Sequence, residues 1–157
     1  MGRKTWQSMP TFLPKRDNFV LSKTMPPEFL RYPSGNQCGF FPTIDAIKEK
    51  CKKENYDTIW IIGGETIYKQ FINDINLTEI HITDINYDFD GDTCFPPIPP
   101  TFTLLSQSKD YQEERIKYNY KIYVNKQGRG IGRSSSDSDF EPLWSVSCGS
   151  FKSIPPP

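Results

Sequence analysis

Strand-like and helix-like segments alternate in the first half of this chain, and this order limits the folds that it can adopt. Three short runs rich in β-branched and aromatic residues cover 18–22, 38–41 and 58–62. Between the last two runs, Ile47 and Cys51 share one face of an expected helix, and Thr43 can cap its start. Such alternation is typical of an α/β protein in which connections cross over a parallel sheet.

The pattern continues beyond residue 62. A second helix is expected after Gly63-Gly64, followed by a strand over 79–85. Two further strands, 102–107 and 116–124, are joined by a polar loop and predict an antiparallel hairpin. Apolar and polar residues alternate along 116–124, so we expect one face of that strand to be buried.

The last part of the chain has a different composition. Residues 127–157 are rich in glycine, serine and proline, and such a segment buries too little apolar surface to offset the entropy lost on ordering. We therefore expect a folded domain over 1–126 and a disordered tail over 127–157. One alternative stays open, because four apolar residues of the tail could dock on an apolar patch: Phe140, Leu143, Trp144 and Val146.

Charge and composition exclude several classes of function. Basic and acidic residues are balanced at 19 each, so no nucleic-acid partner is expected. No apolar run approaches the ~20 residues of a membrane span, and the polar start is unlike a signal peptide. Four cysteines without a C-x-x-C pair, together with a single histidine, predict no metal site. Free cysteines without a secretory signal favour a cytoplasmic location.

Three segments have the character of phosphate-binding sites. Residues 2–5 (Gly-Arg-Lys-Thr) place two cations at the start of an expected short helix, where an anion is favoured. Ser22-Lys23 follows the first strand, and Gly63-Gly64 forms a strand-to-helix turn whose amides can face a phosphate. Each signal is weak by itself, because solvated lysines and glycine turns are common.

Four motifs occur in the order in which the dihydrofolate reductase family has them, and the chain resembles that family from residue 1 to about residue 126. The motifs are Gly2-Arg3-Lys4-Thr5-Trp6, Leu13-Pro14-Lys15-Arg16, Ile62-Gly63-Gly64 with Tyr68, and Gly91-Asp92-Thr93-Cys94-Phe95-Pro96. The resemblance implies an α/β fold with an incomplete, mostly parallel sheet, flanking helices and a C-terminal antiparallel hairpin. It also implies an oxidoreductase that reduces 7,8-dihydrofolate to tetrahydrofolate with NADPH in one-carbon metabolism.

The resemblance assigns cofactor roles to individual residues. Residues 2–5 are implied to hold the pyrophosphate and 2′-phosphate of NADPH, and Ser22-Lys23 to lie beside the same 2′-phosphate. Cations there would favour NADPH over NADH. The implied cofactor-binding residues are Gly2, Arg3, Lys4, Thr5, Ser22, Lys23, Gly63, Gly64 and Tyr68.

A second set of residues is implied to bind dihydrofolate or antifolates. Arg16 matches an arginine that grips the α-carboxylate of the folate glutamate, a task that suits the fork of a guanidinium. Thr83 matches a threonine that hydrogen-bonds the active-site carboxylate. The implied substrate-binding residues are Ser8, Met9, Leu13, Arg16 and Ile62. For Ser8, Met9 and Leu13, ordinary packing is equally compatible with the sequence.

The resemblance begins inside the family's fold. The family's N-terminal portion supplies a central strand and the helix with the Asp or Glu that binds the pterin, and we expect this portion to be absent from the chain. Because that carboxylate orients the pterin, we expect little activity from the chain alone. Two alternatives stay open: a noncatalytic NADPH-binding fragment or interaction module, and a reductase fused to or associated with thymidylate synthase.

Overall fold

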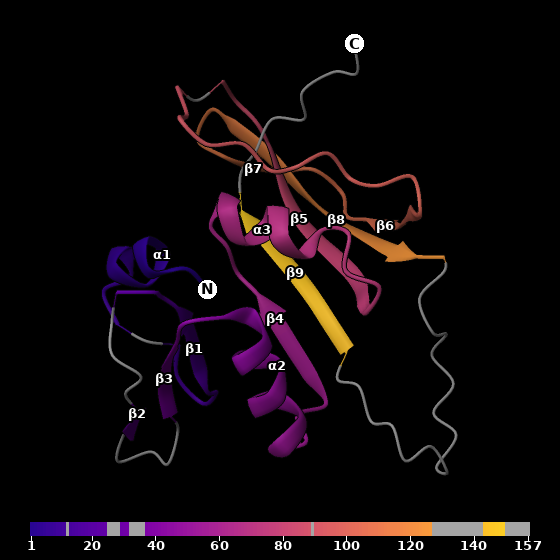
Figure 1. The fold of residues 1–157 in the computed structure, drawn as a ribbon. Helices are drawn as coiled ribbons and strands as arrows, with labels where there is room; N and C mark the ends of the chain where they lie inside the picture. The colour runs from indigo at the N-terminus through magenta and orange to yellow at the C-terminus, as the bar shows by residue number, and fades with distance from the viewer. Residues whose placement is uncertain (12, 25–28, 32–36, 89, 127–142, 150–157) are drawn as a thin grey trace. The chain divides into compact units, whose positions relative to one another are not determined.

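The computed structural model describes residues 1–11, 13–24, 29–31, 37–88, 90–126 and 143–149. The chain divides into two compact units, Met1–Tyr56 and Asp57–Pro157, hereafter unit 1 and unit 2. Each unit contains both helices and strands (Figure 1). The α/β class expected from the sequence is therefore confirmed.

Unit 1 is built on a three-stranded sheet. Its strands are β1 (Asn18–Leu21), β2 (Phe29–Arg31) and β3 (Gln37–Phe41). Their order is β1-β3-β2, with β1 parallel and β2 antiparallel to β3. The first two expected strands are confirmed and pair in parallel as predicted, whereas β2 is an additional strand.

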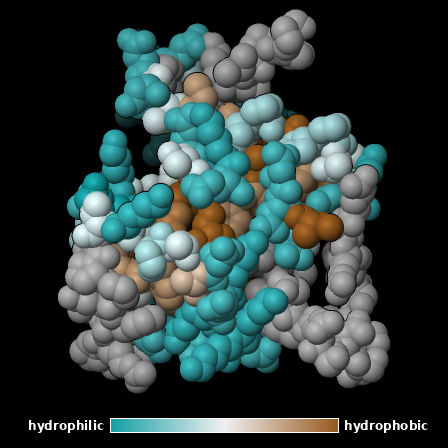
Figure 2. All heavy atoms as spheres, in the orientation of Figure 1, coloured by the Kyte–Doolittle hydropathy of each residue, from teal (hydrophilic) through white to brown (hydrophobic). Residues whose placement is uncertain are grey.

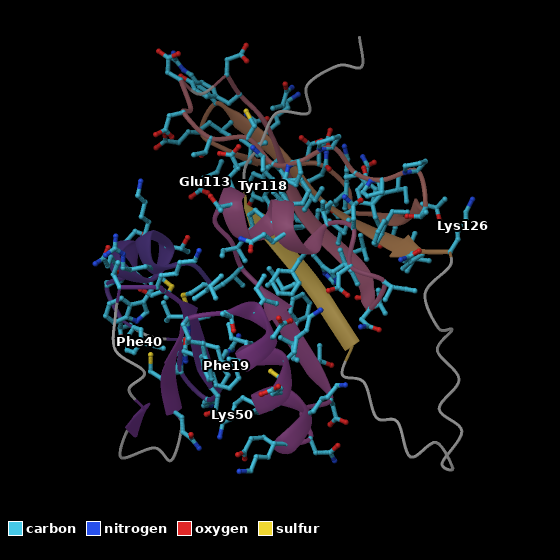
Figure 3. All side chains as sticks on the ribbon, in the orientation of Figure 1. Phe19, Phe40, Lys50, Glu113, Tyr118 and Lys126 are labelled. Atoms are coloured by element: carbon cyan, nitrogen blue, oxygen red, sulfur yellow. The ribbon has the colours of Figure 1, made fainter. Side chains whose placement is uncertain are left out.

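One part of the core of unit 1 forms between this sheet and α1 (Arg3–Ser8). Its rings meet edge to face, a geometry that adds to plain burial. The centroids of Trp6 and Phe40 lie 5.1 Å apart. On the opposite face of the sheet, those of Phe19 and Phe41 lie 5.2 Å apart. Figure 3 labels Phe19 on β1 and Phe40 on β3. Three buried side chains and two partly buried ones make up the central cluster: Val20, Cys38 and Phe40, with Met1 and Trp6.

Helix α2 (Ile44–Lys53) begins as its sequence predicts. The Thr43 Oγ1 accepts a hydrogen bond from the Ala46 backbone N–H at 3.2 Å and so caps the helix. Ile47 and Cys51 are buried, and hydrophilic side chains cover the outer face of the helix (Figure 2). Burial raises the pKa of the Cys51 thiol to about 12, so the thiol stays neutral and packs as a small apolar group.

A hydrogen-bond network ties the end of unit 1 to the start of β1. The Asp17 carboxylate accepts hydrogen bonds from the Gln37 backbone N–H, at 2.7 Å, and from the Tyr56 hydroxyl. Burial, reinforced by the bond to Asp17, raises the pKa of the Tyr56 hydroxyl, so the phenol remains a donor. The Tyr56 ring also meets the Phe19 ring edge to face, with centroids 5.8 Å apart.

Unit 2 contains one mixed sheet. Its strands are β4 (Thr58–Ile61), β5 (Leu77–Asn86), β6 (Phe102–Gln107), β7 (Tyr111–Glu113), β8 (Ile116–Asn125) and β9 (Leu143–Gly149). They run in the order β4-β9-β5-β8-β6, with β7 paired to β8. β9 is parallel to both β4 and β5, whereas β8 is antiparallel to β5, β6 and β7. The predicted hairpin of β6 and β8 is confirmed.

Helix α3 (Glu65–Phe71) follows β4 after the short turn at residues 62–64, as predicted. Its buried residues come at helical spacing, so the helix contributes one apolar face to the core of unit 2. That core also includes residues of β4, β5 and β6. Its buried apolar members are Ile61, Ile67, Tyr68, Phe71, Ile72, Leu77, Ile80 and Phe102.

Strand β8 is less buried than its alternating pattern predicts. None of its residues is fully buried, and Tyr120 is 49% exposed. The rings of Tyr111, Tyr118 and Tyr120 contact one another instead, with centroids 5.6 to 5.9 Å apart. Figure 3 shows Tyr118 together with Glu113 in this β7–β8 hairpin. The prediction of a buried face on β8 is therefore wrong, because its tyrosines contact one another at the surface and do not enter a core.

The structure also differs from the expected disordered tail over Leu143–Gly149, which form β9. Strand pairing on both edges satisfies the backbone groups of this segment and offsets part of the entropy cost of ordering it. The other residues of the expected tail, Phe140 among them, lie outside the described residues.

We expect Tyr56→Phe to destabilise unit 1. The substitution keeps the ring but removes the hydroxyl donor to Asp17, and loss of a hydrogen bond to a charged group costs about 1.5–3 kcal/mol. Urea unfolding, followed by hydrogen exchange of amides in residues 18–41, measures the change. The matched control, Tyr111→Phe in the exposed hairpin, should stay within about 0.5 kcal/mol of the unchanged chain. Equal stability of the two variants would show that the contact with Asp17 contributes nothing.

Candidate functional site

One corner of unit 1 brings Gly2, Arg3 and Ser22 together. Gly2 forms a parallel bridge with Leu21, which places the start of α1 beside the end of β1. The Arg3 Nη1 donates a hydrogen bond to the Thr24 Oγ1 at 3.0 Å. The hydroxyl oxygens of Ser22 and Thr24 lie 3.5 Å apart. Two segments implied to bind the same cofactor are therefore neighbours, although Arg3 and Thr24 are 21 positions apart in the sequence.

Backbone hydrogen bonds fix this corner. The Leu21 N–H donates to the Met1 carbonyl, and the Ser22 N–H donates to the Phe41 carbonyl, each at 2.8 Å. Ser22 is only 6% exposed, so its side chain is held at the end of the sheet. These backbone hydrogen bonds tie the corner to the end of the sheet.

Positive charge gathers on the exposed residues of the same segments. Arg3 and Lys4 begin α1, Lys23 follows Ser22, and all three are exposed. The N-cap residue of α1 is Gly2, which has no side chain to cap the first turn. A guanidinium and ammonium groups beside hydroxyl groups suit a phosphate, because each supplies donors to its oxygens.

The turn that carries Arg16 is held by one buried amide. The Asn18 side chain accepts a hydrogen bond from the Leu13 N–H at 3.0 Å and donates to the carbonyls of Leu13 and Arg16, each at 2.9 Å. Asn18 is 2% exposed, and Lys15 within the turn has a φ of 60°. Arg16 lies at the surface, where its Nε donates to the Pro14 carbonyl at 3.1 Å. The turn therefore presents an exposed guanidinium from a fixed backbone.

Ser8 and Met9 end α1. The exposed Ser8 hydroxyl donates to the Thr5 carbonyl at 2.8 Å, and the Met9 N–H donates to the Trp6 carbonyl at 3.2 Å. These bonds stay within the helix and its end. The substrate roles implied for Ser8, Met9 and Leu13 stay predictions.

In unit 2, the Gly63-Gly64 turn is shaped around the ring of Tyr68. Gly63 has a φ of 88°, and the peptide bond between the two glycines is cis. A Cβ on Gly63 would lie 2.7 Å from two ring carbons of Tyr68, so only glycine fits there. Tyr68 is buried, and its ring centroid lies 5.0 Å from that of Phe95. The structure thus brings together three residues from two of the motifs.

Ile62 and Thr83 are half-buried in the same unit. Ile62 directly follows β4, and Thr83 lies in β5, where it pairs with Tyr120 of β8 and Gly149 of β9. Neither position shows a contact that defines a ligand role. The roles implied for these residues stay predictions.

The implied residues divide between the units, with those up to Lys23 in unit 1 and those from Ile62 onward in unit 2. Sequence reasoning did not single out two residues that organise the unit 1 group, Thr24 and Asn18. Thr24 had one available signal, because it directly follows Ser22-Lys23. Asn18 had another, because it is a polar residue at the start of an apolar strand. Their partners become visible only in the fold.

Within the described ranges, no group of three or more His, Cys, Asp or Glu side chains is arranged to hold a metal ion. No helix among those residues is long and apolar enough to cross a membrane.

We expect Gly63→Ala to disrupt the turn before α3. The new Cβ would clash with the Tyr68 ring, and alanine would have to adopt the positive φ of Gly63. Strain of this kind costs about 1–3 kcal/mol. Thermal unfolding and the near-ultraviolet signal of the tyrosines measure the effect. Gly91→Ala is the matched control, because its Cβ would meet no atom closer than 3.8 Å. A Gly63→Ala variant as stable as Gly91→Ala would contradict the close approach to Tyr68.

Comparison with known proteins identifies the family of this chain. The dihydrofolate reductase family model matches residues 1–127. The dihydrofolate reductase of Sus scrofa is 36% identical over 135 residues, which cover 78% of this chain and 70% of the relative. The dihydrofolate reductases of Drosophila melanogaster and Heliothis virescens are 34% and 33% identical to this chain. Each match covers 78% of this chain, and they cover 70% and 68% of the respective relatives. The chain therefore belongs to the dihydrofolate reductase family of oxidoreductases.

Proposed function

We propose that this chain binds NADPH and acts in the reduction of 7,8-dihydrofolate to tetrahydrofolate, a step of one-carbon metabolism in the cytoplasm. Membership of the family supports the reaction type. The observation that carries the cofactor assignment is the corner of unit 1 in which Arg3 bonds Thr24 beside Ser22.

The chemistry of this corner fits a phosphate monoester. The Thr24 hydroxyl accepts from one guanidinium nitrogen of Arg3 and so orients the fork, while the other donors of the guanidinium can serve a ligand. Lys23 and Lys4 add exposed positive charge on the adjoining segments. A phosphate dianion gains more from such donors than a neutral hydroxyl does, which is the basis for preferring NADPH to NADH.

The second cofactor group lies in unit 2. Gly63 has no side chain, so a ligand and the Tyr68 ring can both approach the backbone of the turn. The residues implied to act there are Gly63, Gly64 and Tyr68. When bound, NADPH supplies the hydride that the reduction requires.

Arg16 is the proposed anchor of the substrate. Its turn is closed by the buried Asn18 amide, so the guanidinium projects from a backbone that is already ordered before a ligand arrives. A guanidinium fork matches the two oxygens of a carboxylate, such as the α-carboxylate of a folate glutamate. Thr83 is proposed to support the substrate site through its hydroxyl, and antifolates are proposed to bind the same site.

The cofactor assignment predicts selective loss of NADPH affinity. Arg3→Ala and Lys23→Ala should each weaken NADPH binding about tenfold or more, the value of a hydrogen bond to a charged group, and change NADH binding little. Fluorescence titration of the full chain with each nucleotide measures both affinities. Lys53→Ala, which removes an exposed lysine of α2, is the matched control and should leave both unchanged. Equal weakening of NADPH and NADH would contradict a contact with the 2′-phosphate.

The substrate assignment predicts a different phenotype for Arg16→Ala. Dihydrofolate or an antifolate should bind about tenfold more weakly because the carboxylate loses a charged partner, whereas NADPH affinity should be unchanged. Titration with each ligand and the absorbance at 340 nm during turnover are the measurements. A chain that binds both ligands without consuming NADPH would identify the noncatalytic alternative. Association with thymidylate synthase stays a prediction, and co-purification of the two proteins would test it.

A further inference from the structure

Strand β9 joins two strands that do not pair with each other. Leu143–Val146 pair with all four residues of β4, and Trp144–Gly149 pair with β5. Within the part of the chain that the structure describes, β4 pairs with no other strand. Figure 1 shows β9 lying between β4 and β5. Among the described strands, β4 is therefore linked to the rest of the sheet through β9 alone.

β9 and its two partner strands differ in whether they match the family model. β4 and β5 lie inside the residues that match the family model, 1–127, whereas β9 lies outside them. Two strands that match the family model thus pair with a strand that lies outside the match. We call the pair of strands β4 and β5 the acceptor, because β9 lies between them.

The connection is long for the distance that it covers. Val124 of β8 and Trp144 of β9 pair with Glu79 and Leu77 of β5, so both ends of the connection lie at the same end of the sheet. β8 and β9 lie on either side of β5, and two strand spacings amount to about 10 Å. A segment with the length of residues 127–142 can span ~50 Å. Chain length therefore permits β9 to leave the sheet and return without displacing β8.

Two described side chains of the acceptor meet across β9. Trp60 of β4 pairs with Ser145, and His81 of β5 pairs with Ser147. The rings of Trp60 and His81 nevertheless lie with centroids 4.9 Å apart, although a whole strand separates their backbones. The Nε2 atom of His81 lies 2.7 Å from the Glu79 Oε2, which orients the imidazole. We call this group of Trp60, Glu79 and His81 the clasp.

The sequence of β9 has small residues at the two positions paired with the rings of the clasp. Serine stands at both positions paired with the rings of the clasp, and Trp144, Val146 and Cys148 alternate with these serines. Without an occupant, β4 and one edge of β5 would present unpaired N–H and C=O groups, which bind extended peptides readily.

We propose that β4 and β5 form a strand-binding site, that the clasp covers it, and that β9 of the same chain is its exchangeable ligand. The site takes an extended segment in parallel orientation with small residues at the positions paired with Trp60 and His81. A copy of the β9 sequence supplied on a separate molecule replaces the resident strand. This site does not depend on the proposed cofactor function.

Hydrogen exchange of the full chain tests the occupancy of the site. Ser145→Pro removes a ladder N–H from β9, so amides of Thr58–Ile61 should exchange about tenfold faster or more. Amides of β6 and β8 should keep their protection, because their pairing with each other does not involve β9. Ser145→Ala is the matched control and should behave as the unchanged chain. Equal exchange of β4 in all three chains would overturn the proposal.

A synthetic peptide with the sequence of residues 141–151 tests exchange. Added to the Ser145→Pro chain, it should restore slow exchange of Thr58–Ile61 in proportion to its concentration. A peptide with proline at the position of Ser145 should have no effect. Failure of the first peptide to protect β4 would refute an exchangeable ligand.

A crosslink tests the register without disturbing the strand. Ile82 pairs with Cys148, and paired positions have Cα atoms within the range that a disulfide spans. Ile82→Cys should therefore form an intramolecular disulfide with Cys148 under a mild copper–phenanthroline oxidant, identified by peptide mapping. Ile85→Cys is the control, because Ile85 lies beyond the residues of β5 that pair with β9. The parallel register would be contradicted if Ile82→Cys formed no disulfide with Cys148, or if Ile85→Cys formed it equally well.

The clasp makes a separate contribution. Trp60→Ala should speed exchange of the β4 amides by about 2- to 12-fold, the range expected for one aromatic contact. Leu105→Ala is the control, because Leu105 is an exposed apolar residue of β6 in the same unit. If both variants match the unchanged chain, the clasp does not retain β9.

Discussion

In unit 2, the strand pairing of β4 depends on β9, because a strand without a partner leaves its N–H and C=O groups unsatisfied. β4 pairs with β9 and leads directly into the Gly63-Gly64 turn. The Tyr68 ring packs against that turn and against Phe95. Residues that belong to the family's motifs are therefore supported by a strand that lies outside the family match.

Unit 1 relies on a few polar side chains with several partners each. Asn18 closes the turn that carries Arg16, and Thr24 receives the guanidinium of Arg3. A buried amide such as that of Asn18 is costly unless its hydrogen bonds are made, so its contacts also restrict the local backbone. The exposed cations are thus held on a backbone that needs little ordering when a ligand binds.

Periodicity predicted the elements whose apolar residues repeat regularly. The Thr43 cap and the spacing of Ile47 and Cys51 define α2, and the β-rich runs define β1, β3 and β4. Periodicity failed where tertiary contacts decide burial. The alternation along β8 predicts a buried face, but Tyr118 and Tyr120 contact each other and Tyr111 instead. β9 was not predicted as a strand, and docking of its apolar residues was kept only as an alternative, because its polar surroundings resemble a disordered segment. Its pairing partners are strands distant in sequence.

For the candidate site, the sequence by itself determined the family and the residue types, because motifs such as Gly2-Arg3-Lys4-Thr5 and Ile62-Gly63-Gly64 can be read in order along the chain. Only the tertiary structure decided that Thr24 receives Arg3 and that Gly63 must lack a side chain beside Tyr68. It also decided that residues 143–149 complete the sheet. The physical reason is the same in each case: composition and spacing act locally, whereas strand partners, ring contacts and hydrogen-bond partners come from residues far apart in the chain.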